Sequence, residues 1–216
     1  MTEKRSYEFG STIVAKIDDA DGLRDVLVGP WFECETIVVK PNWVSKETAD
    51  FSDARTMRTL FEALDRQIVV TESHMLLRHA GGKEFAVGGQ IVDWDWLLVG
   101  DGWQWLIDHP GWDWFIEGGH WERLREEEQR FLDENGFSDL FEEFGVTYIN
   151  VTDEVWNGRI TDPADVREAV EARFDPLRTE AFLSMVPYKL FDLRGSTFIS
   201  LAKLKCYASF TFKNLF

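Results

Sequence analysis

Polar side chains that could bind an anion or move a proton follow three apolar runs of the sequence. Lys40-Pro41-Asn42 ends the first run, Glu72-Ser73-His74 ends the second, and Lys203-Leu204-Lys205 follows the third. Lysine ammonium groups attract phosphate and carboxylate ligands, and a carboxylate can act as a general acid or base. If the three runs are parallel strands, their polar ends share the edge of the sheet where open α/β folds bind ligands. The motifs therefore predict one site at that edge.

Within this predicted site, each candidate residue has a role that fits its chemistry. Glu72 is the candidate catalytic acid or base, since it is the ionisable carboxylate of the three motifs. The candidate ligand-binding residues are Lys40, Asn42, Lys203, Lys205, Lys213 and Asn214. The alternatives are a solvated lysine face and a carboxylate that caps a loop.

The distribution of charge singles out the end of the chain. The 216 residues carry a formal net charge of −16, yet residues 189–216 have a balance of +4, which leaves −20 for the preceding residues. A basic segment beside an acidic body predicts a small anionic ligand, phosphate or carboxylate. The overall acidity argues against nucleic acid as a partner. No apolar run is long enough to predict a membrane-spanning segment.

Cysteine and histidine usage bears on metals and on cellular location. Cys34 and Cys206 are the two cysteines, too few for the four thiolates of the usual iron–sulfur cluster. The four histidines show no paired metal-ligand spacing, so no metal site is predicted and any cofactor is unknown. The low cysteine content and the charged N-terminal residues predict a cytoplasmic protein.

The elements that must position the motifs alternate between strand and helix. The β-branched runs 35–40 and 67–71 predict buried parallel neighbours, joined through a helix over 53–66 that Ser52 caps. The pattern predicts an α/β fold, a mostly parallel sheet with helices on both faces, as a single domain over residues 1–216. Further strands are expected at 12–17, 146–151 and 198–201, and helices at 19–28, 120–135, 138–144 and from Pro163 to about Phe174, the last capped by Asp162.

Tryptophans recur every nine residues within the segment 80–120 and just beyond it. The repeat is Trp-x-Trp followed by two apolar residues, and glycine-rich turns separate its copies. Nine residues turn an α-helix through about 900°, which would place successive repeats on opposite faces. We therefore interpret residues 80–120 as a Trp-rich insertion that forms a small antiparallel meander. Its rings make either a satellite core or an interface with a second copy or a partner protein.

Several of these motifs resemble the domain of unknown function 362 family. The resemblance rests on Lys40-Pro41-Asn42-Trp43-Val44, on the Ser52-Asp53 helix start, on Ile68-Val69-Val70-Thr71-Glu72, and on the two lysines 203 and 205 followed by Phe212-Lys213-Asn214-Leu215-Phe216. Some members carry ferredoxin-type cysteine motifs, which this chain lacks, so no iron–sulfur cluster is expected in it. The family often has a histidine where this chain has Tyr207. Its members also continue past the Lys-Asn-Leu-Phe motif, so the resemblance implies a domain that is incomplete after Phe216.

Two functions of different classes follow from these features. The first is an enzyme or binding domain that acts on a small anionic metabolite at the carboxyl edge of the sheet. The second is a protein-interaction module that docks a partner, such as a redox protein, through its Trp-rich acidic surface. The basic end of the chain favours the first function, and the tryptophan repeat favours the second.

Overall fold

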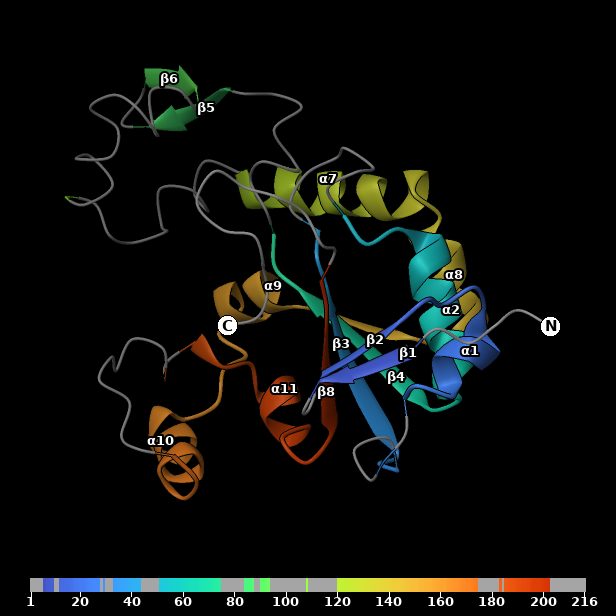
Figure 1. Ribbon diagram of the computed structural model, residues 1–216. Helices are drawn as coiled ribbons and strands as arrows, with labels where there is room; N and C mark the ends of the chain where they lie inside the picture. The colour runs from blue at the N-terminus through green and yellow to red at the C-terminus, as the bar shows by residue number, and fades with distance from the viewer. Residues whose placement is uncertain are drawn as a thin grey trace.

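A four-stranded parallel sheet forms the centre of the fold (Figure 1). The computed structural model describes residues 6–9, 12–27, 29, 33–43, 51–74, 84–87, 90–93, 108, 120–174, 183 and 185–202. The sheet has the order β7-β4-β3-β8, and each neighbouring pair is parallel. Its strands are β3 (Thr36–Pro41), β4 (Gln67–Glu72), β7 (Thr147–Asn150) and β8 (Thr197–Leu201). The predicted α/β class is confirmed.

The central pair of strands is the one that the sequence predicts. β3 and β4 are parallel neighbours with Thr36 beside Gln67, and helix α2 (Ala54–Leu64) connects them. Both strands are buried on both faces over most of their length, which explains their continuous apolar runs. The predicted pairing is confirmed, with strand bounds that differ by one residue.

One face of the sheet packs against α2 and α8 (Phe137–Phe144). Successive strand residues point to opposite faces, so alternate side chains of β3 and β4 turn toward these helices. Trp43, just beyond β3, is fully buried here, and its ring centroid lies 4.5 Å from that of Phe137. The apolar side chains of this layer include Ile37, Val39, Ile68, Val70, Met57, Leu60, Phe61, Leu64, Leu140 and Phe141.

The opposite face carries a smaller apolar layer. Val38, Val69 and Ile149, one from each of three strands, pack with Leu190 and Leu193 around helix α11 (Tyr188–Asp192). Helices therefore cover both faces, as the sequence predicts. The helix predicted to start at Pro163 is α10 (Pro163–Glu171), and the Asp162 side chain caps it as expected.

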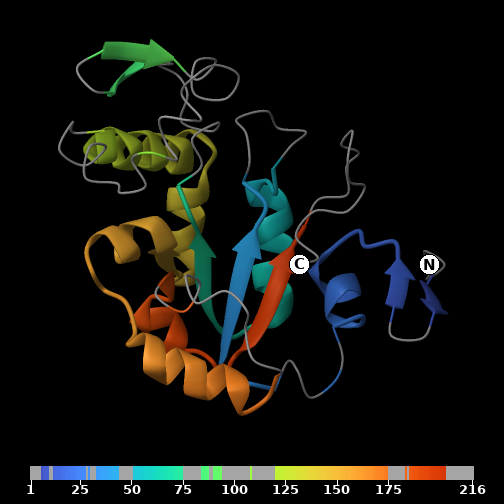
Figure 2. The same ribbon diagram turned by 90° about the vertical axis from the view of Figure 1, so that its left-hand side faces the viewer.

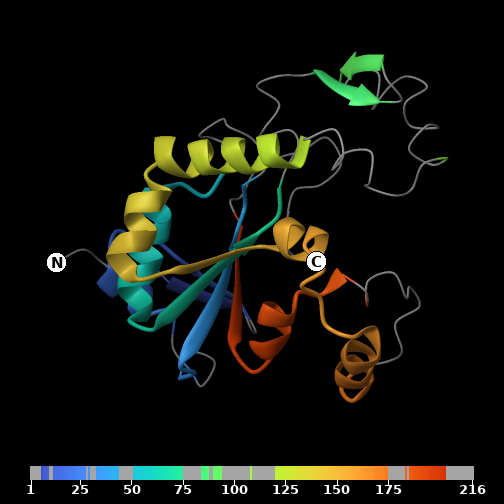
Figure 3. The same cartoon turned by 180° about the vertical axis from the view of Figure 1, so that it is seen from behind.

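The carboxyl ends of the strands meet a long helix. α7 (His120–Glu134) runs across this edge of the sheet (Figures 1 and 2). β7 leads straight into the short helix α9 (Val151–Trp156), which lies on the same edge. Figure 3 shows both elements in a view of the molecule from behind. The end of β4, the end of β7 and both helices are thus brought together.

The strand order reverses once. From β3 the chain adds β4 and then β7 on one side, whereas β8 pairs with the other side of β3. In open α/β sheets such a switch opens a crevice outside the carboxyl ends of the two strands. Here the switch lies between β3 and β8, where Pro41 is in register with Leu201.

Within the described residues, two antiparallel hairpins lie outside the parallel sheet. β1 (Ser6–Phe9) pairs with β2 (Thr12–Ala15), and α1 (Ala20–Arg24) follows. The strand expected at 12–17 thus belongs to this hairpin and not to the main sheet. A second hairpin of β5 (Glu84–Val87) and β6 (Gln90–Asp93) lies in the segment 80–120. The tryptophan repeats of the expected meander fall outside the described residues. In the part of the chain that the structure describes, no helix is long and apolar enough to span a bilayer.

Candidate functional site

Lys40, Asn42 and Glu72 lie together at the carboxyl edge, as the sequence predicts. Lys40 Nζ is 3.4 Å from Glu72 Oε2, so the ammonium group and the carboxylate form an ion pair across β3 and β4. The Glu72 side chain is nearly buried, and its Oε1 accepts a hydrogen bond from the Ser73 N–H at 3.0 Å. Asn42 is buried beside the end of β3. Glu72, the predicted acid or base, is therefore paired with Lys40, and its catalytic role stays a prediction.

The remaining predicted ligands lie outside the described residues: Lys203, Lys205, Lys213 and Asn214. The strand register still places the end of β8, the last described strand before these residues. β8 ends at Leu201 beside Pro41 of β3, at the same edge as Lys40 and Asn42. Convergence of the two groups at this edge stays a prediction.

Ser52 ties this edge together, and it does so in place of the helix-capping role predicted for it. Asp53 caps α2 by accepting from the Thr56 N–H at 2.8 Å. The buried Ser52 hydroxyl donates to the Leu201 carbonyl at 2.8 Å and accepts from the Asn42 N–H at 3.2 Å. The prediction placed the cap one residue early, because Ser and Asp are both favoured N-caps and they are adjacent here.

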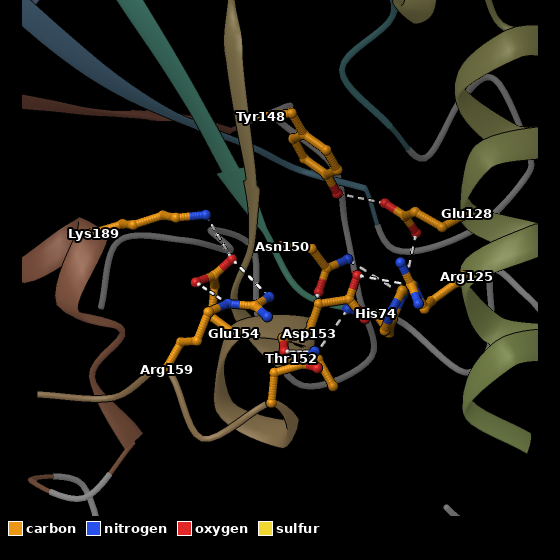
Figure 4. Close-up of polar contacts among 11 residues, drawn as sticks. His74, Arg125, Glu128, Tyr148, Asn150, Thr152, Asp153, Glu154, Arg159 and Lys189 are labelled. Atoms are coloured by element: carbon orange, nitrogen blue, oxygen red, sulfur yellow. Dashed lines mark hydrogen bonds and ion pairs between the residues drawn. The ribbon is translucent and has the colours of Figure 1, made fainter.

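His74, two residues beyond β4, lies between two carboxylates from different helices (Figure 4). Its Nε2 is 3.0 Å from Asp153 Oδ1 of α9, and its Nδ1 is 3.8 Å from Glu128 Oε2 of α7. The exposed fractions of the side chains are 2% for His74, 5% for Glu128 and 21% for Asp153. The His74 backbone N–H also donates to the Thr152 hydroxyl at 3.2 Å, which fixes the residue against α9.

Each carboxylate has a further partner. The Tyr148 hydroxyl donates to Glu128 Oε1 at 2.5 Å. Arg125 Nε lies 3.6 Å from Asp153 Oδ2, and the Arg125 side chain is 57% exposed. The result is a continuous polar network from β7 through α7 and the end of β4 to α9, drawn in Figure 4.

This environment shifts the proton affinity of the imidazole. Burial lowers the pKa of His74, but the hydrogen bonds and charges of Asp153 and Glu128 outweigh it and raise the pKa above its ordinary value of 6.5. The site therefore favours the charged form of the imidazole, the side chain whose ordinary pKa lies nearest to neutral pH.

A pocket of about 530 Å³ opens beside this network. Its volume falls in the range of small-molecule sites, which is about 300–1,000 Å³. The wall comes from α7, from the ends of β4 and β7, from α9 and from Arg159, three residues after α9. The lining residues are His74, Glu122, Arg125, Glu126, Glu128, Gln129, Leu132, Tyr148, Asn150, Asp153, Glu154 and Arg159.

A second ion-pair cluster braces the far wall of the pocket. Glu154 of α9 accepts from Arg159 Nε at 2.9 Å and Nη2 at 3.1 Å, and from Lys189 Nζ of α11 at 3.0 Å. Arg159, ahead of Lys189, holds the pKa of Glu154 below its usual value of 4.5. Because α9 and α11 meet at this carboxylate, the cluster fixes the position of the helix that carries Asp153.

Metal binding gains no support from the described residues. Among them, no group of three or more His, Cys, Asp or Glu side chains is arranged to hold a metal ion. The acidic groups around His74 instead make hydrogen bonds and ion pairs with it and with Tyr148 and Arg125.

The sequence pointed to the motif Glu72-Ser73-His74 and chose Glu72 as its candidate acid or base, a role that stays a prediction, whereas the structure places His74 between two carboxylates. The histidines show no paired metal-ligand spacing, so the sequence assigns His74 no role, and its partners Glu128 and Asp153 lie 54 and 79 positions further along the chain. The sequence does contain one local signal for polar groups at this edge. It is a helix-start pattern directly after a strand, with Asn150 followed three residues later by Asp153.

Comparison of the chain with protein-family models, with curated proteins and with solved structures finds no match to any of them. The resemblance to the domain of unknown function 362 family stays a prediction.

Proposed function

We propose that the chain is an enzyme that binds a small polar metabolite in the pocket beside His74 and exchanges a proton with it through the imidazole. The observation that carries this proposal is the ring of His74 between two carboxylates, in a pocket of about 530 Å³ at the carboxyl edge of a parallel sheet. Open α/β folds bind their ligands at this edge.

The energetics of the network support a functional role. Bringing two carboxylates and an imidazole out of water is unfavourable, and apolar side chains of similar size would stabilise a fold equally well or better. Groups with perturbed pKa values that gather in a pocket are typical of catalytic sites. The pKa of His74 is raised, and Glu128 and Asp153, with side chains 5% and 21% exposed, are both directed at its ring.

The roles of the residues follow from their contacts. His74 is the proton donor and acceptor, since its pKa is raised above 6.5 and it lines the pocket. Asp153 orients the ring through Nε2 and stabilises the imidazolium form, as a carboxylate does in other acid–base dyads. Arg125 is an exposed partner of Asp153 and reaches the pocket from α7, so it is placed to contact the ligand.

The charge of the lining restricts the ligand. Glu154 is neutralised by Arg159 and Lys189, whereas Glu122, Glu126, Glu128 and Asp153 share the wall with Arg125. A carboxylate-rich wall attracts positive charge and hydrogen-bond donors. The ligand proposed for this pocket therefore presents amine, amide or hydroxyl groups toward α7.

A thermal-shift assay tests this proposal with a panel of small amines, amino acids, sugars and hydroxy acids. Compounds that bind the pocket raise the melting temperature of the wild-type chain, because a ligand of the folded state stabilises it by mass action. The rise should be lost in His74→Gln and kept in Arg58→Gln, which alters an exposed ion pair on α2. A panel in which every stabilising compound acts equally on wild type and His74→Gln would contradict the proposal.

A second candidate is an anion site at the switch between β3 and β8. The reversal of strand order there favours it, because the crevice at such a switch is the usual ligand site of an open sheet. Lys40 and Asn42 lie at the end of β3, and the basic end of the chain follows β8 at the same edge. Lys40 already pairs with Glu72, so an anion bound there competes with that carboxylate.

The two candidates predict different responses to inorganic phosphate. If the anion site exists, phosphate stabilises the wild type more than a Lys203→Gln, Lys205→Gln, Lys213→Gln variant at low salt. Phosphate also stabilises proteins by exclusion from their surface, so the difference between the two chains is the relevant quantity. Equal stabilisation of both chains would leave the lysines as a solvated face. The interaction-module hypothesis stays a prediction, since the tryptophan repeats lie outside the described residues.

A further inference from the structure

Asn150 holds two neighbours at once, and its two amide atoms cannot exchange places. It is the N-cap of α9, and its Oδ1 accepts a hydrogen bond from the Asp153 N–H at 3.2 Å. If the amide were reversed, its NH2 group would face this N–H donor and the cap would be lost. The oxygen is therefore committed to the helix, and the NH2 group must point the other way.

The NH2 group of Asn150 points at His74. Its Nδ2 lies 3.3 Å from Nδ1 of the imidazole (Figure 4). An amide NH2 is a donor, so Nδ1 must offer its lone pair, and in the neutral ring the hydrogen is then on Nε2. Nε2–H in turn meets Asp153 Oδ1 at 3.0 Å. Both contacts of the ring agree on the same tautomer.

We propose that Asn150 is a positioning residue that keeps neutral His74 in the Nε2–H form, so that Nδ1 is the atom that takes up and releases the proton. This inference deepens the proposed acid–base function and rests on it for its purpose. When Nδ1 gains a proton it can no longer accept from Asn150, and it turns to the carboxylate of Glu128. Glu128 Oε2 lies 3.8 Å away, so a small movement of the ring or of α7 makes that hydrogen bond.

Some groups packed around the ring favour its charged form, and others favour its neutral form. From α9, Asp153 favours the imidazolium, and from α7, Glu128 does the same. Arg125 of α7 pairs with Asp153 and weakens the stabilisation of the imidazolium by that carboxylate. The Tyr148 hydroxyl of β7 donates to Glu128 and weakens the stabilisation by Glu128 in the same way. The Asn150 amide of β7 stabilises the neutral ring by donating to it. Glu72 at the end of β4 is held by Lys40, and Thr152 and Trp156 of α9 contact His74 without charge.

Nitrogen-15 NMR of the histidine rings reads the tautomer directly in the wild-type chain. Assignment by comparison with His74→Gln separates its signals from those of the other three histidines. Above the titration midpoint, the proposal expects an Nε2 signal of a protonated nitrogen and an Nδ1 signal of an unprotonated one. An Nδ1–H tautomer, or an even mixture of the two, would overturn it.

Asn150→Asp tests the cause. The new side chain keeps an acceptor for the Asp153 N–H but replaces the NH2 donor by a carboxylate oxygen, which favours a proton on Nδ1. The titration midpoint of His74 should rise by about one pH unit or more, the usual effect of a carboxylate in place of a donor. Asn157→Asp is the matched control, because it adds the same charge at the other end of α9, where Asn157 caps the helix and bonds the Asp153 carbonyl.

Equal shifts of the midpoint in the two variants would mean that charge alone matters, and they would overturn the role of Asn150. If Asn150→Asp does not fold, Asn150→Ser still tests the role, since serine caps helices and lacks the NH2 donor; an unchanged tautomer and midpoint in it would contradict the inference. These measurements need no ligand. If the tautomer is confirmed and no compound depends on His74, the proposed function fails while the role of Asn150 stands.

Discussion

The imidazole Nε2 of His74 lies 3.0 Å from Oδ1 of Asp153, although the two residues are 79 positions apart in the chain. His74 follows β4 and Asp153 lies in the first turn of α9, so the parallel pairing of β4 with β7 brings them together. The contact therefore forms only when the sheet is folded. For this reason the titration of His74 is linked to the free energy of unfolding.

The free energy of unfolding should depend on pH through His74. The pKa of His74 is raised in the folded state, so its imidazolium form stabilises the fold. That contribution is fully present below the unfolded pKa of about 6.5, and it is lost as the pH rises through the folded pKa. Wild type should thus exceed His74→Gln in stability by more at about pH 5.5 than at about pH 8.5. Each unit of raised pKa corresponds to about 1.4 kcal/mol.

Urea unfolding of the two chains over a pH series measures this difference. Groups that titrate alike in both chains cancel, which leaves the contribution of residue 74. A difference that grows with increasing pH would mean that His74 is buried in its neutral form, against the expected direction.

Removal of the Tyr148 hydroxyl should destabilise the fold. In Tyr148→Phe the buried Oε1 of Glu128 loses the donor that lies 2.5 Å away. A buried acceptor left without its partner costs about 1–3 kcal/mol. Tyr188→Phe is the matched control, because Tyr188 of α11 is 41% exposed. Chemical denaturation of both variants checks the prediction, and equal losses would contradict it.

Glu154→Gln should loosen the wall of the pocket. The carboxylate holds Arg159 and Lys189 and is itself 6% exposed, while its two partners are partly exposed and can be solvated after its loss. We expect a loss of about 1–3 kcal/mol, as for a buried group with broken hydrogen bonds. Glu143→Gln, which removes the exposed partner of Arg58, should cost less.

The effect of Glu154→Gln should also vary with pH in the direction opposite to that of His74. The pKa of Glu154 is lowered in the folded state, so its contribution is present above about 4.5 and lost as the pH falls through the folded value. A loss of stability in Glu154→Gln that is larger in acid than at neutral pH would refute the assigned ion pairs.

Ser52 and Asp53 should differ in the consequences of their replacement by alanine. Asp53→Ala removes the cap of α2, a loss of about 1 kcal/mol. Ser52→Ala leaves both the Leu201 carbonyl and the Asn42 N–H without the hydroxyl, and a buried group without its partner costs about 1–3 kcal/mol. Ser52→Ala should therefore be the more destabilising change. The reverse order in thermal or urea unfolding would contradict the stabilising role given to the Ser52 hydroxyl.

The central strands were predictable because their signal is local. The runs at 35–40 and 67–71 are apolar on both faces, and that pattern arises in parallel strands covered by helices. The strand expected at 12–17 is just as β-branched in sequence, yet it pairs with residues 6–9. Local pattern identifies a strand, but it does not say which sheet the strand joins.

The site was predictable only in its location. Strand ends were expected to carry polar groups, and Lys40 and Glu72 do meet there. The partners of His74 come from α7 and α9, and helical spacing does not show which charged residues of an exposed helix turn toward a distant strand end. Glu128 looks like one more acid in a run of three, until the packing of α7 across the sheet edge buries it.

NMR titration of the His74 ring tests the acid–base proposal most directly. The measurement follows the ring signals of His74 against pH in the wild type and in Asp153→Asn, with Asp133→Asn on the exposed side of α7 as the control. The wild-type midpoint should lie above 6.5, because Asp153 and Glu128 raise the pKa of His74. The midpoint should fall in Asp153→Asn and stay unchanged in Asp133→Asn. A wild-type midpoint at or below 6.5 that does not respond to Asp153→Asn would show that His74 is a buried structural histidine and not a proton-transfer group.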